Sequence, residues 1–305
     1  MEPDQSRDYG QIQTDWSGCS GPQEIGELSL TVVATEIACW ACEEMVRDEP
    51  DANGYIRCGH CGLAFRPSLP APRERYDQDY FDQYSGGSYT ELEPYRRHEA
   101  RVRLKLIPRS RLEGNRLLEI GSAAGYFLDE AGRAGWRAVG VEPSGEVARY
   151  AREELGVEVR TGFAEDVNLD QFSPDVVCAW HVIEHIPDPS GILVSIRKAL
   201  ANPGCLLIEV PNGASLRAQC EGDEWVPLEP DVHVAQWTPP AMRTLLERAG
   251  FSRVETETVP FVTYIASRMR RAPRRVLLAI RQRRWLSDPH PSGNELIRAI
   301  AWKAD

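Results

Sequence analysis

Residues 116–142, RLLEIGSAAGYFLDEAGRAGWRAVGVE, contain an apolar strand, a glycine-bearing turn, an amphipathic helix and a second strand that ends in an acid. Gly121 lets a ligand approach the backbone, and the helix after Gly125 begins with unpaired N–H groups. Glu142 follows Gly121 by 21 residues, where a carboxylate can accept both hydroxyls of a ribose. Because the third glycine of the GxGxxG dinucleotide fingerprint is absent, the stretch predicts a Rossmann-like unit for another nucleoside-containing cofactor.

Short apolar segments and amphipathic segments alternate on through the chain. Strands are expected at 116–120, 138–141, 157–159, 175–180 and 205–210, and helices at 125–134, 146–155 and 191–200. This β-α-β-α-β order predicts an α/β fold with a doubly wound, mostly parallel sheet. A helix at 239–249 and strands at 252–258 and 261–265 complete the expected core.

Five segments are expected along the chain. They are a weakly structured leader at 1–35, a Cys-rich zinc ribbon at 36–68, a helical lead-in or lid at 69–115, the core at 116–266, and an Arg-rich helical tail at 267–305. In the lead-in, a helix at 95–106 should stop before Pro108.

Four cysteines have the spacing Cys39-x2-Cys42-x15-Cys58-x2-Cys61. Each pair can sit on a tight turn that points two thiolates at one tetrahedral ion, which is the spacing of a four-cysteine zinc site. A shell closed by four thiolates leaves no position for water. The sequence therefore predicts a zinc ion that stabilises the fold and takes no part in catalysis.

The composition is that of an ordinary globular chain: 305 residues, 42% hydrophobic, 27% charged, with a net charge of −11. These values exclude fibrous and wholly disordered proteins. The N-terminal residues resemble no secretory signal, and no uncharged apolar run reaches the roughly 18 residues of a spanning helix. The expected location is the cytoplasm.

Basic charge gathers in one window, 268–284, which holds eight arginines and no acid. A solvated helix face is the simplest account, and the window also suits a phosphate-bearing substrate, an acidic surface of the same chain, or peripheral contact with anionic lipid. The alternative function is a nucleic-acid-binding or RNA-modifying protein that uses the ribbon and this window. The acidic remainder of the chain argues against it, and no nucleic-acid partner is expected.

Several motifs together resemble class I S-adenosylmethionine-dependent methyltransferases. They are LLEIGSAAGYFL at 117–128, GVEPS at 140–144, TGFAEDV at 161–167, PDVVCAWHVIEHIPDP at 174–189 and HVAQWTPPAMRTLLERAGF at 233–251. The CxxC…CxxCGLAF unit followed by YDQDYFDQY resembles a subgroup with an N-terminal zinc ribbon, which includes some sugar C-methyltransferases. The resemblance implies S-adenosylmethionine as the cofactor and an antiparallel last strand.

The resemblance also implies roles for individual residues. Glu119, Gly121 and Gly125 would bracket the methionine end of the cofactor, and Glu142 would hold the ribose. The whole expected cofactor set is Glu119, Gly121, Ser122, Gly125, Glu142, Pro143, Ala164, Glu165, Trp180 and Tyr84. Ala164 and Glu165 in this set would flank the adenine. The chain departs from the family at Ala123, where a glycine is usual, and at Phe163, where many relatives have an aspartate.

The sequence His181-Val-Ile-Glu184-His185 also matches the H-x-x-E-H signature of some zinc peptidases, a remote alternative. That site needs two histidines on one face of a sustained helix. Pro187 follows at once and a buried strand precedes, so no more than a turn or two of helix can form here. The peptidase is therefore disfavoured.

The expected function is methyl transfer to a small-molecule acceptor, at a hydroxyl or at a carbon of a sugar or secondary metabolite. Transfer to a hydroxyl needs a base, and a histidine with a pKa near ambient pH can serve. His181 and His233 are the catalytic candidates, whereas His185 is expected to pack. Sugar C-methylating relatives have an acid directly before the histidine that corresponds to His233, where this chain has Val232.

Overall fold

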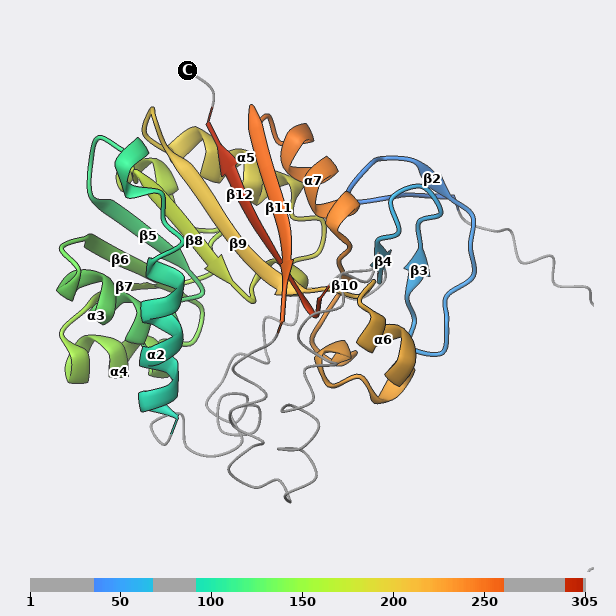
Figure 1. The fold of residues 1–305 in the computed structure, drawn as a ribbon, viewed down its shortest axis with the longest axis horizontal. Helices are drawn as coiled ribbons and strands as arrows, with labels where there is room; N and C mark the ends of the chain where they lie inside the picture. The colour runs from blue at the N-terminus through green and yellow to red at the C-terminus, as the bar shows by residue number, and fades with distance from the viewer. Residues whose placement is uncertain (1–35, 68–91, 261–293, 304–305) are drawn as a thin grey trace, which may run out of the picture. The chain divides into compact units, whose positions relative to one another are not determined.

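The computed structural model describes residues 36–67, 92–260 and 294–303 (Figure 1). The expected leader at 1–35, the tyrosine-rich part of the lead-in and the arginine window at 268–284 lie outside these residues. Within the described ranges, no helix is both long and apolar enough to cross a membrane.

A seven-stranded mixed sheet forms the centre of the described chain, with strand order β11-β12-β9-β8-β5-β6-β7. Its strands are β5 (Arg116–Ile120), β6 (Arg137–Glu142), β7 (Glu158–Thr161), β8 (Val176–Trp180), β9 (Cys205–Pro211), β11 (Arg253–Val259) and β12 (Leu296–Trp302). Strands β5 to β9 pair in parallel, and β12 pairs antiparallel with both β9 and β11. The predicted doubly wound sheet with an antiparallel last strand is confirmed.

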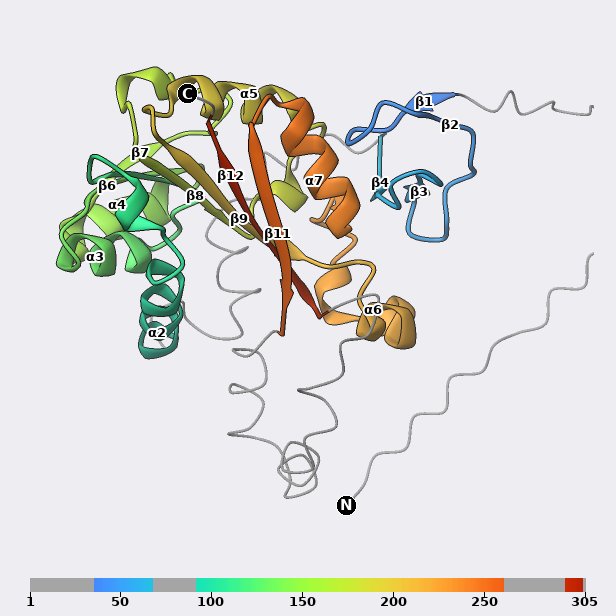
Figure 2. The same cartoon turned by 45° about the horizontal axis from the view of Figure 1, so that its top comes forward.

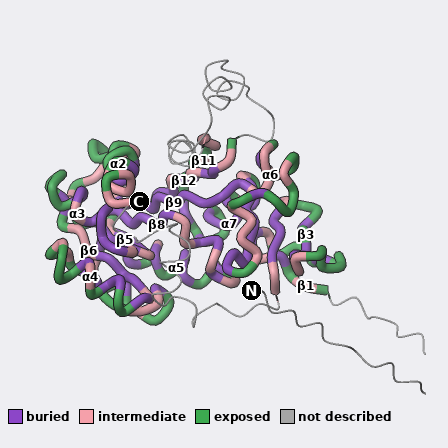
Figure 3. The backbone as a smooth tube through the Cα atoms, turned by 90° about the horizontal axis from the view of Figure 1, so that it is seen from below, coloured by how far each residue is buried: buried purple, intermediate pink, exposed green. Residues whose placement is uncertain are grey.

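Helices cover both faces of the sheet. They are α2 (Glu93–Leu104), α3 (Tyr126–Arg133), α4 (Gly145–Leu155), α5 (Ser190–Ala199) and α7 (Pro239–Arg248), with bounds within two residues of those predicted. Alternate residues of β5 reach opposite faces: Leu117 packs with α3 and α4, whereas Leu118 packs with α5 and α7. Figure 2 shows α5 and α7 together beside the sheet, and Figure 3 shows α2 and α5 on opposite sides of the buried β5 and β8.

The assignment of 267–305 to a helical tail is wrong at its C-terminal end, because Leu296–Trp302 is the antiparallel strand β12. The strand expected at 261–265 lies outside the described residues. Strand β12, LIRAIAW, is buried along most of its length, so it lacks a clean apolar–polar alternation. Because this segment lies near the arginine window, the sequence suggested that it belongs to a helical tail. Its pairing with β9 and β11 instead makes it a strand.

The Cys-rich segment forms short antiparallel pairs: β1 (Ile37–Ala38) with β2 (Met45–Val46), and β3 (Ile56–Arg57) with β4 (Ala64–Phe65). Strand β4 also pairs with β10 (Ala235–Gln236). The apolar side chains of this ribbon, Leu63 and Phe65 among them, join the same buried cluster as Trp237 and Leu246. The ribbon therefore shares its core with the α5 and α7 side of the sheet.

Short helical segments make the connections. They are η2 (Arg109–Arg111), η3 (Leu169–Gln171), η4 (Ile183–His185), α6 (Leu216–Glu221), η5 (Gly222–Glu224) and η6 (Val226–Leu228).

Candidate cofactor and acceptor site

The glycine turn after β5 lies at the carboxyl edge of the parallel strands, where ligands of open α/β sheets bind. Gly121 has φ +71°, and a Cβ there would lie 2.5 Å from Cγ2 of Val182. Gly125 has φ +81° and caps the start of α3. Ala123, where a glycine was expected, adopts φ +44°, so the turn keeps its left-handed backbone despite the added methyl group.

Glu142 joins this turn to the end of β6. One carboxylate oxygen accepts a hydrogen bond from the N–H of Ala123 at 2.8 Å, and the other from the N–H of Ser144 at 3.0 Å. Burial raises the pKa of Glu142 to about 7, against the two N–H donors, which favour the carboxylate. Each oxygen of the Glu142 carboxylate accepts one hydrogen bond within the fold and keeps a further lone pair. These lone pairs could accept from ribose hydroxyls at the predicted position.

Two buried polar groups of the turn have no hydrogen-bond partner among the described residues: Oε2 of Glu119 and Oγ of Ser122. Burial, together with the charge of Glu142, raises the pKa of Glu119 well above its usual range, although the charge of Arg103 acts in the other direction. Buried polar atoms rarely remain unsatisfied, so these two indicate that a polar ligand completes the turn.

His181 begins the loop after β8, with φ +57°. Its Nδ1 lies 3.3 Å from Oε1 of Glu184, and its Nε2 lies 3.5 Å from Oε1 of Glu209. Burial lowers the pKa of His181, but the hydrogen bonds and charges of these two acids outweigh it and raise the pKa to about 9. At neutral pH the ring is therefore an imidazolium that donates, and it cannot accept a proton.

Sequence reasoning missed the ionic group beneath His181. Arg103 of α2 donates to Oε1 of Glu209 at 2.6 Å, and Arg298 of β12 donates to Oε2 of the same carboxylate. Burial raises the pKa of Glu209, but Arg103, His181 and Arg298 together outweigh it and hold that pKa well below its usual range. One acid inside the apolar strand CLLIEVP was the available signal, because acids are rarely buried without a partner.

His233 is buried at the ribbon side of the same loop region. Its Nδ1 donates to the carbonyl of Pro227 at 2.9 Å, and its own carbonyl accepts from the hydroxyl of Tyr55 at 2.8 Å. Burial, and then the neighbouring charge of His185, lower the pKa of His233 to about 3. The ring is therefore neutral at pH 7, and it is a weak base because its protonated form is strongly disfavoured.

The H-x-x-E-H motif forms a single 3₁₀ turn, Ile183–His185, as the prolines predicted. His185 donates from Nδ1 to the carbonyl of Val232 at 3.1 Å, and its ring meets that of His233 edge-to-face at 4.6 Å. Glu184 and His185 of the motif therefore lie close to His233, while His181 lies between Glu184 and Glu209.

Comparisons with known proteins agree with this geometry. A sequence model of the family described as "Methyltransferase domain" matches residues 92–256, more than half of the chain. The chain belongs to this methyltransferase family. The matched region is a class I S-adenosylmethionine-dependent methyltransferase domain, and it includes the glycine turn, Glu142 and both histidine segments.

The methyltransferase is similar to the ubiquinone biosynthesis O-methyltransferase of Cereibacter sphaeroides, with 28% identity over 49% of this chain and 65% of that protein. The corresponding enzyme of Hahella chejuensis is 34% identical over 34% of this chain and 46% of its own length. The chain thus spans less than two thirds of these curated relatives. Phosphoethanolamine N-methyltransferase 2 of Haemonchus contortus, solved with S-adenosylmethionine, shares the fold with a TM-score of 0.55 at 16% identity, covering 79% of this chain and 62% of that one.

The remaining expected cofactor residues of the methyltransferase fall at different places. Pro143 is half-buried between Glu142 and the cap of α4, and the loop after β7 begins beside it, since the N–H of Gly162 donates to the carbonyl of Glu142 at 2.9 Å. In that loop Ala164 is buried within the apolar core, whereas Glu165 is exposed. The expected place of these two neighbouring residues beside the adenine stays a prediction.

Trp180 is the last residue of β8, and its side chain lies on the face of the sheet that α3 covers. Its ring meets Phe127 edge-to-face at 5.5 Å, and the guanidinium of Arg103 lies 5.0 Å from its ring centre. The indole Nε1 is buried without a hydrogen-bond partner among the described residues. Tyr84, the last expected cofactor residue, lies outside the described ranges.

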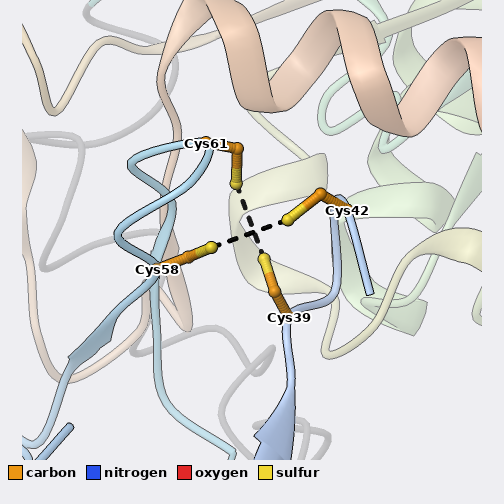
Figure 4. A group of neighbouring side chains, drawn as sticks. All are labelled: Cys39, Cys42, Cys58 and Cys61. Carbon is orange, nitrogen blue, oxygen red and sulfur yellow. Dashed lines mark hydrogen bonds between the residues drawn. The ribbon is translucent and has the colours of Figure 1, made fainter. Parts of the chain in front are cut away.

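The four predicted metal-ligating cysteines of the methyltransferase come together (Figure 4). Sγ of Cys39 lies 3.6 Å from Sγ of Cys61, and Sγ of Cys42 lies 3.5 Å from Sγ of Cys58. All four sulfurs lie within 4.8 Å of one another. Two CxxC turns from opposite hairpins thus present a four-sulfur cluster of the size that a tetrahedral ion requires.

Proposed function

We propose that this methyltransferase moves the methyl group of S-adenosylmethionine to a hydroxyl oxygen of a small molecule. The observation that carries the proposal is Glu142, a buried carboxylate tied to the glycine turn at the carboxyl edge of β5 and β6. Similarity to O-methyltransferases favours an oxygen acceptor over a sugar carbon. The acceptor is expected beside the loop after β8, which follows the strand next to β5.

The glycine turn fits the cofactor because it offers hydrogen-bond acceptors for the ribose of the nucleoside and N–H donors for the methionine end. Glu142 would accept from the ribose hydroxyls, the N–H groups around Gly121 and Gly125 would face the methionine end, and the unsatisfied Oγ of Ser122 and Oε2 of Glu119 would bond its polar atoms. Pro143 would border the ribose. When bound, the cofactor supplies a methyl group already activated by the sulfonium.

Transfer from a sulfonium is an in-line displacement, so the chain's main task is to hold the acceptor oxygen in line with methyl and sulfur. Neither His181 nor His233 has a pKa near neutral pH in this structure. We therefore assign His181, whose two ring nitrogens face Glu184 and Glu209, to holding the loop after β8 in place, and His233 to shaping the segment before β10. The proton of the acceptor hydroxyl leaves to solvent as the methyl–oxygen bond forms. The role of a free imidazole base, for which His181 and His233 were the alternative candidates, has no support from these pKa values.

The ribose assignment is tested by calorimetric titration of S-adenosylmethionine into Glu142→Ala. Loss of the acceptor for two hydroxyls in a partly dry site should cost about 1–3 kcal/mol, which is a several-fold or greater loss of affinity. Glu146→Ala is the control, since this exposed acid lies in the next helix. Unchanged affinity in Glu142→Ala would contradict the assignment. A mass gain of one methyl group on a phenol or sugar alcohol would identify the acceptor class.

We also propose that Cys39, Cys42, Cys58 and Cys61 hold one structural zinc ion. Four sulfurs at 3.5–3.6 Å across the cluster form a closed soft donor set, which suits zinc and leaves no position for water. Metal analysis of the purified chain should show zinc, and the Cys39→Ser/Cys61→Ser variant should contain one zinc ion fewer per chain. Zinc content that is unchanged in this variant would refute the proposal.

A further inference from the structure

A second group of metal-ligand side chains lies apart from the four cysteines, where the loop after β8 meets the segment before β10. One carboxylate oxygen of Glu184 and one ring nitrogen each of His185 and His233 lie within 4.8 Å of one another. Ligands around a tetrahedral ion are about 3.4 Å apart when each is about 2.1 Å from the metal. Small side-chain rotations would therefore bring these three atoms to one ion.

Both rings are oriented as metal-binding histidines are. Nδ1 of His185 donates to the carbonyl of Val232, and Nδ1 of His233 donates to the carbonyl of Pro227. Because a carbonyl only accepts, each neutral ring has its lone pair on Nε2. A backbone carbonyl that fixes the tautomer and the ring direction is the usual outer partner of a ligating imidazole.

Glu184 supplies the independent observation. Its side chain is 1% exposed; Oε1 faces Nδ1 of His181, and Oε2 has no hydrogen-bond partner among the described residues. The ion pair with His181, 3.3 Å from Nδ1 to Oε1, neutralises part of its charge but satisfies only one side of the group. Buried carboxylates are paired, hydrogen-bonded or bound to metal, so the remaining lone pairs of Glu184 call for a cation.

Glu229 extends the group toward solvent. Its Oε2 lies 3.6 Å from Nε2 of His233, and its side chain is about one third exposed. A second carboxylate at this position adds negative charge on the open side of the cluster, where a cation would enter.

We propose that Glu184, His185 and His233 bind a divalent first-row transition-metal ion, a site separate from the four-cysteine cluster. Two imidazoles and a carboxylate favour such ions over Mg²⁺ and Ca²⁺, which prefer all-oxygen shells. Three protein ligands leave at least one position for an exchangeable oxygen ligand, unlike the closed cysteine shell.

The site adjoins the cofactor turn. Strands β5 and β8 are parallel neighbours, and Val182, which precedes the Ile183–His185 turn, packs against Gly121. On the proposed function, the metal site therefore lies in the loop beside which the acceptor is expected.

Cobalt titration of the metal-free wild-type chain tests this site without any substitution. Co²⁺ bound by thiolates gives a sulfur-to-metal charge-transfer band, whereas Co²⁺ bound by imidazole and carboxylate gives only d–d bands. We expect the charge-transfer band to saturate after one equivalent, while d–d absorption rises to a second. Saturation of both bands together at one equivalent would overturn the proposal.

Matched variants then assign the ligands. After dialysis against Zn²⁺, Glu184→Gln and His233→Asn should each contain one ion fewer per chain than wild type, whereas Cys39→Ser/Cys61→Ser should retain this ion. His98→Asn is the control, since His98 is an exposed histidine of α2. Equal zinc in wild type, Glu184→Gln and His233→Asn would refute the site. S-adenosylmethionine affinity is measured separately, so its loss or absence bears on the proposed function and leaves the metal count unaffected.

Discussion

At the scale of single residues, the apo fold and the cofactor favour different protonation states of Glu142, and this difference should appear as a pH dependence of binding. The apo fold holds its pKa at about 7, above the usual value of 4.5, because burial disfavours the charged form. A raised pKa stabilises the protonated fold: this contribution is fully present below pH 4.5 and is lost as pH rises through 7. The ribose hydroxyls instead need the carboxylate, so the fold and the cofactor favour opposite protonation states.

We therefore expect S-adenosylmethionine to bind more weakly as pH falls below about 7, with Kd rising by up to about tenfold per pH unit. Calorimetric titrations between pH 5.5 and about 8 measure this slope. Glu142→Gln cannot titrate and should bind weakly with a flat profile. A slope in Glu142→Gln equal to that of wild type would assign the pH dependence to another group.

Gly121 makes a second prediction at this scale. Gly121→Ala adds a left-handed strain of about 1–2 kcal/mol and a methyl group that would sit 2.5 Å from Val182. Gly156→Ala is matched, because Gly156 has φ +68° but open space around its Cβ position. Denaturant unfolding should show the larger loss in Gly121→Ala, together with weaker cofactor binding. Equal losses in the two variants would mean that Val182 moves aside freely.

At the scale of elements, β12 and β9 are joined by charge as well as by backbone pairing. Glu209 of β9 receives Arg103 from α2 and Arg298 from β12, so one buried acid ties a helix and two strands together. Its place within CLLIEVP was visible in sequence, but its two partners lie 106 and 89 residues away. Local pattern could therefore predict the strand and could not predict the ionic group.

Glu209→Gln should lower the free energy of unfolding by about 3–5 kcal/mol, because it leaves Arg103 buried beside a neutral amide. The exposed pair of Arg253 and Glu255 on β11 gives the control, and Glu255→Gln should change stability by less than about 1 kcal/mol. Urea unfolding monitored by tryptophan fluorescence measures both. If Glu209→Gln proves as mild as Glu255→Gln, the ionic group does not hold these elements together.

At the scale of the whole molecule, the sequence predicted what short-range pattern encodes. The period of the apolar residues gave β5 to β9 and their helices, and the CxxC spacing gave the four-sulfur cluster. It missed β12, whose strand state depends on pairing with β9 and β11. It did not predict the protonation of the histidines: Glu184 and Glu209 raise the pKa of His181, whereas burial and the charge of His185 lower the pKa of His233.

The ribbon and the His233 segment form one structural unit, and this was not visible in the sequence. Tyr55 donates to the carbonyl of His233, the N–H of Arg66 donates to the carbonyl of Val234, and Thr238 donates to the carbonyl of Cys61 at 2.7 Å. With the pairing of β4 and β10, the ribbon holds the backbone of this segment at several points. The cysteine cluster, far from Glu142 in sequence, thus supports the segment that we propose to lie on the acceptor side.

Loss of the proposed zinc ion should therefore loosen this segment before it affects the sheet. In Cys39→Ser/Cys61→Ser we expect faster amide hydrogen exchange across 227–238, because β10 loses its partner strand, while amides of β5 and β8 keep wild-type protection. Cofactor affinity should stay within about twofold of wild type, since Glu142 and the glycine turn do not touch the ribbon in the described hydrogen bonds. Cys220→Ser, at an exposed free cysteine of α6, controls for the removal of a thiol. Exchange that rises equally in 227–238 and in β5 would show global destabilisation, and unchanged exchange in 227–238 would show that the segment holds its position without the ribbon.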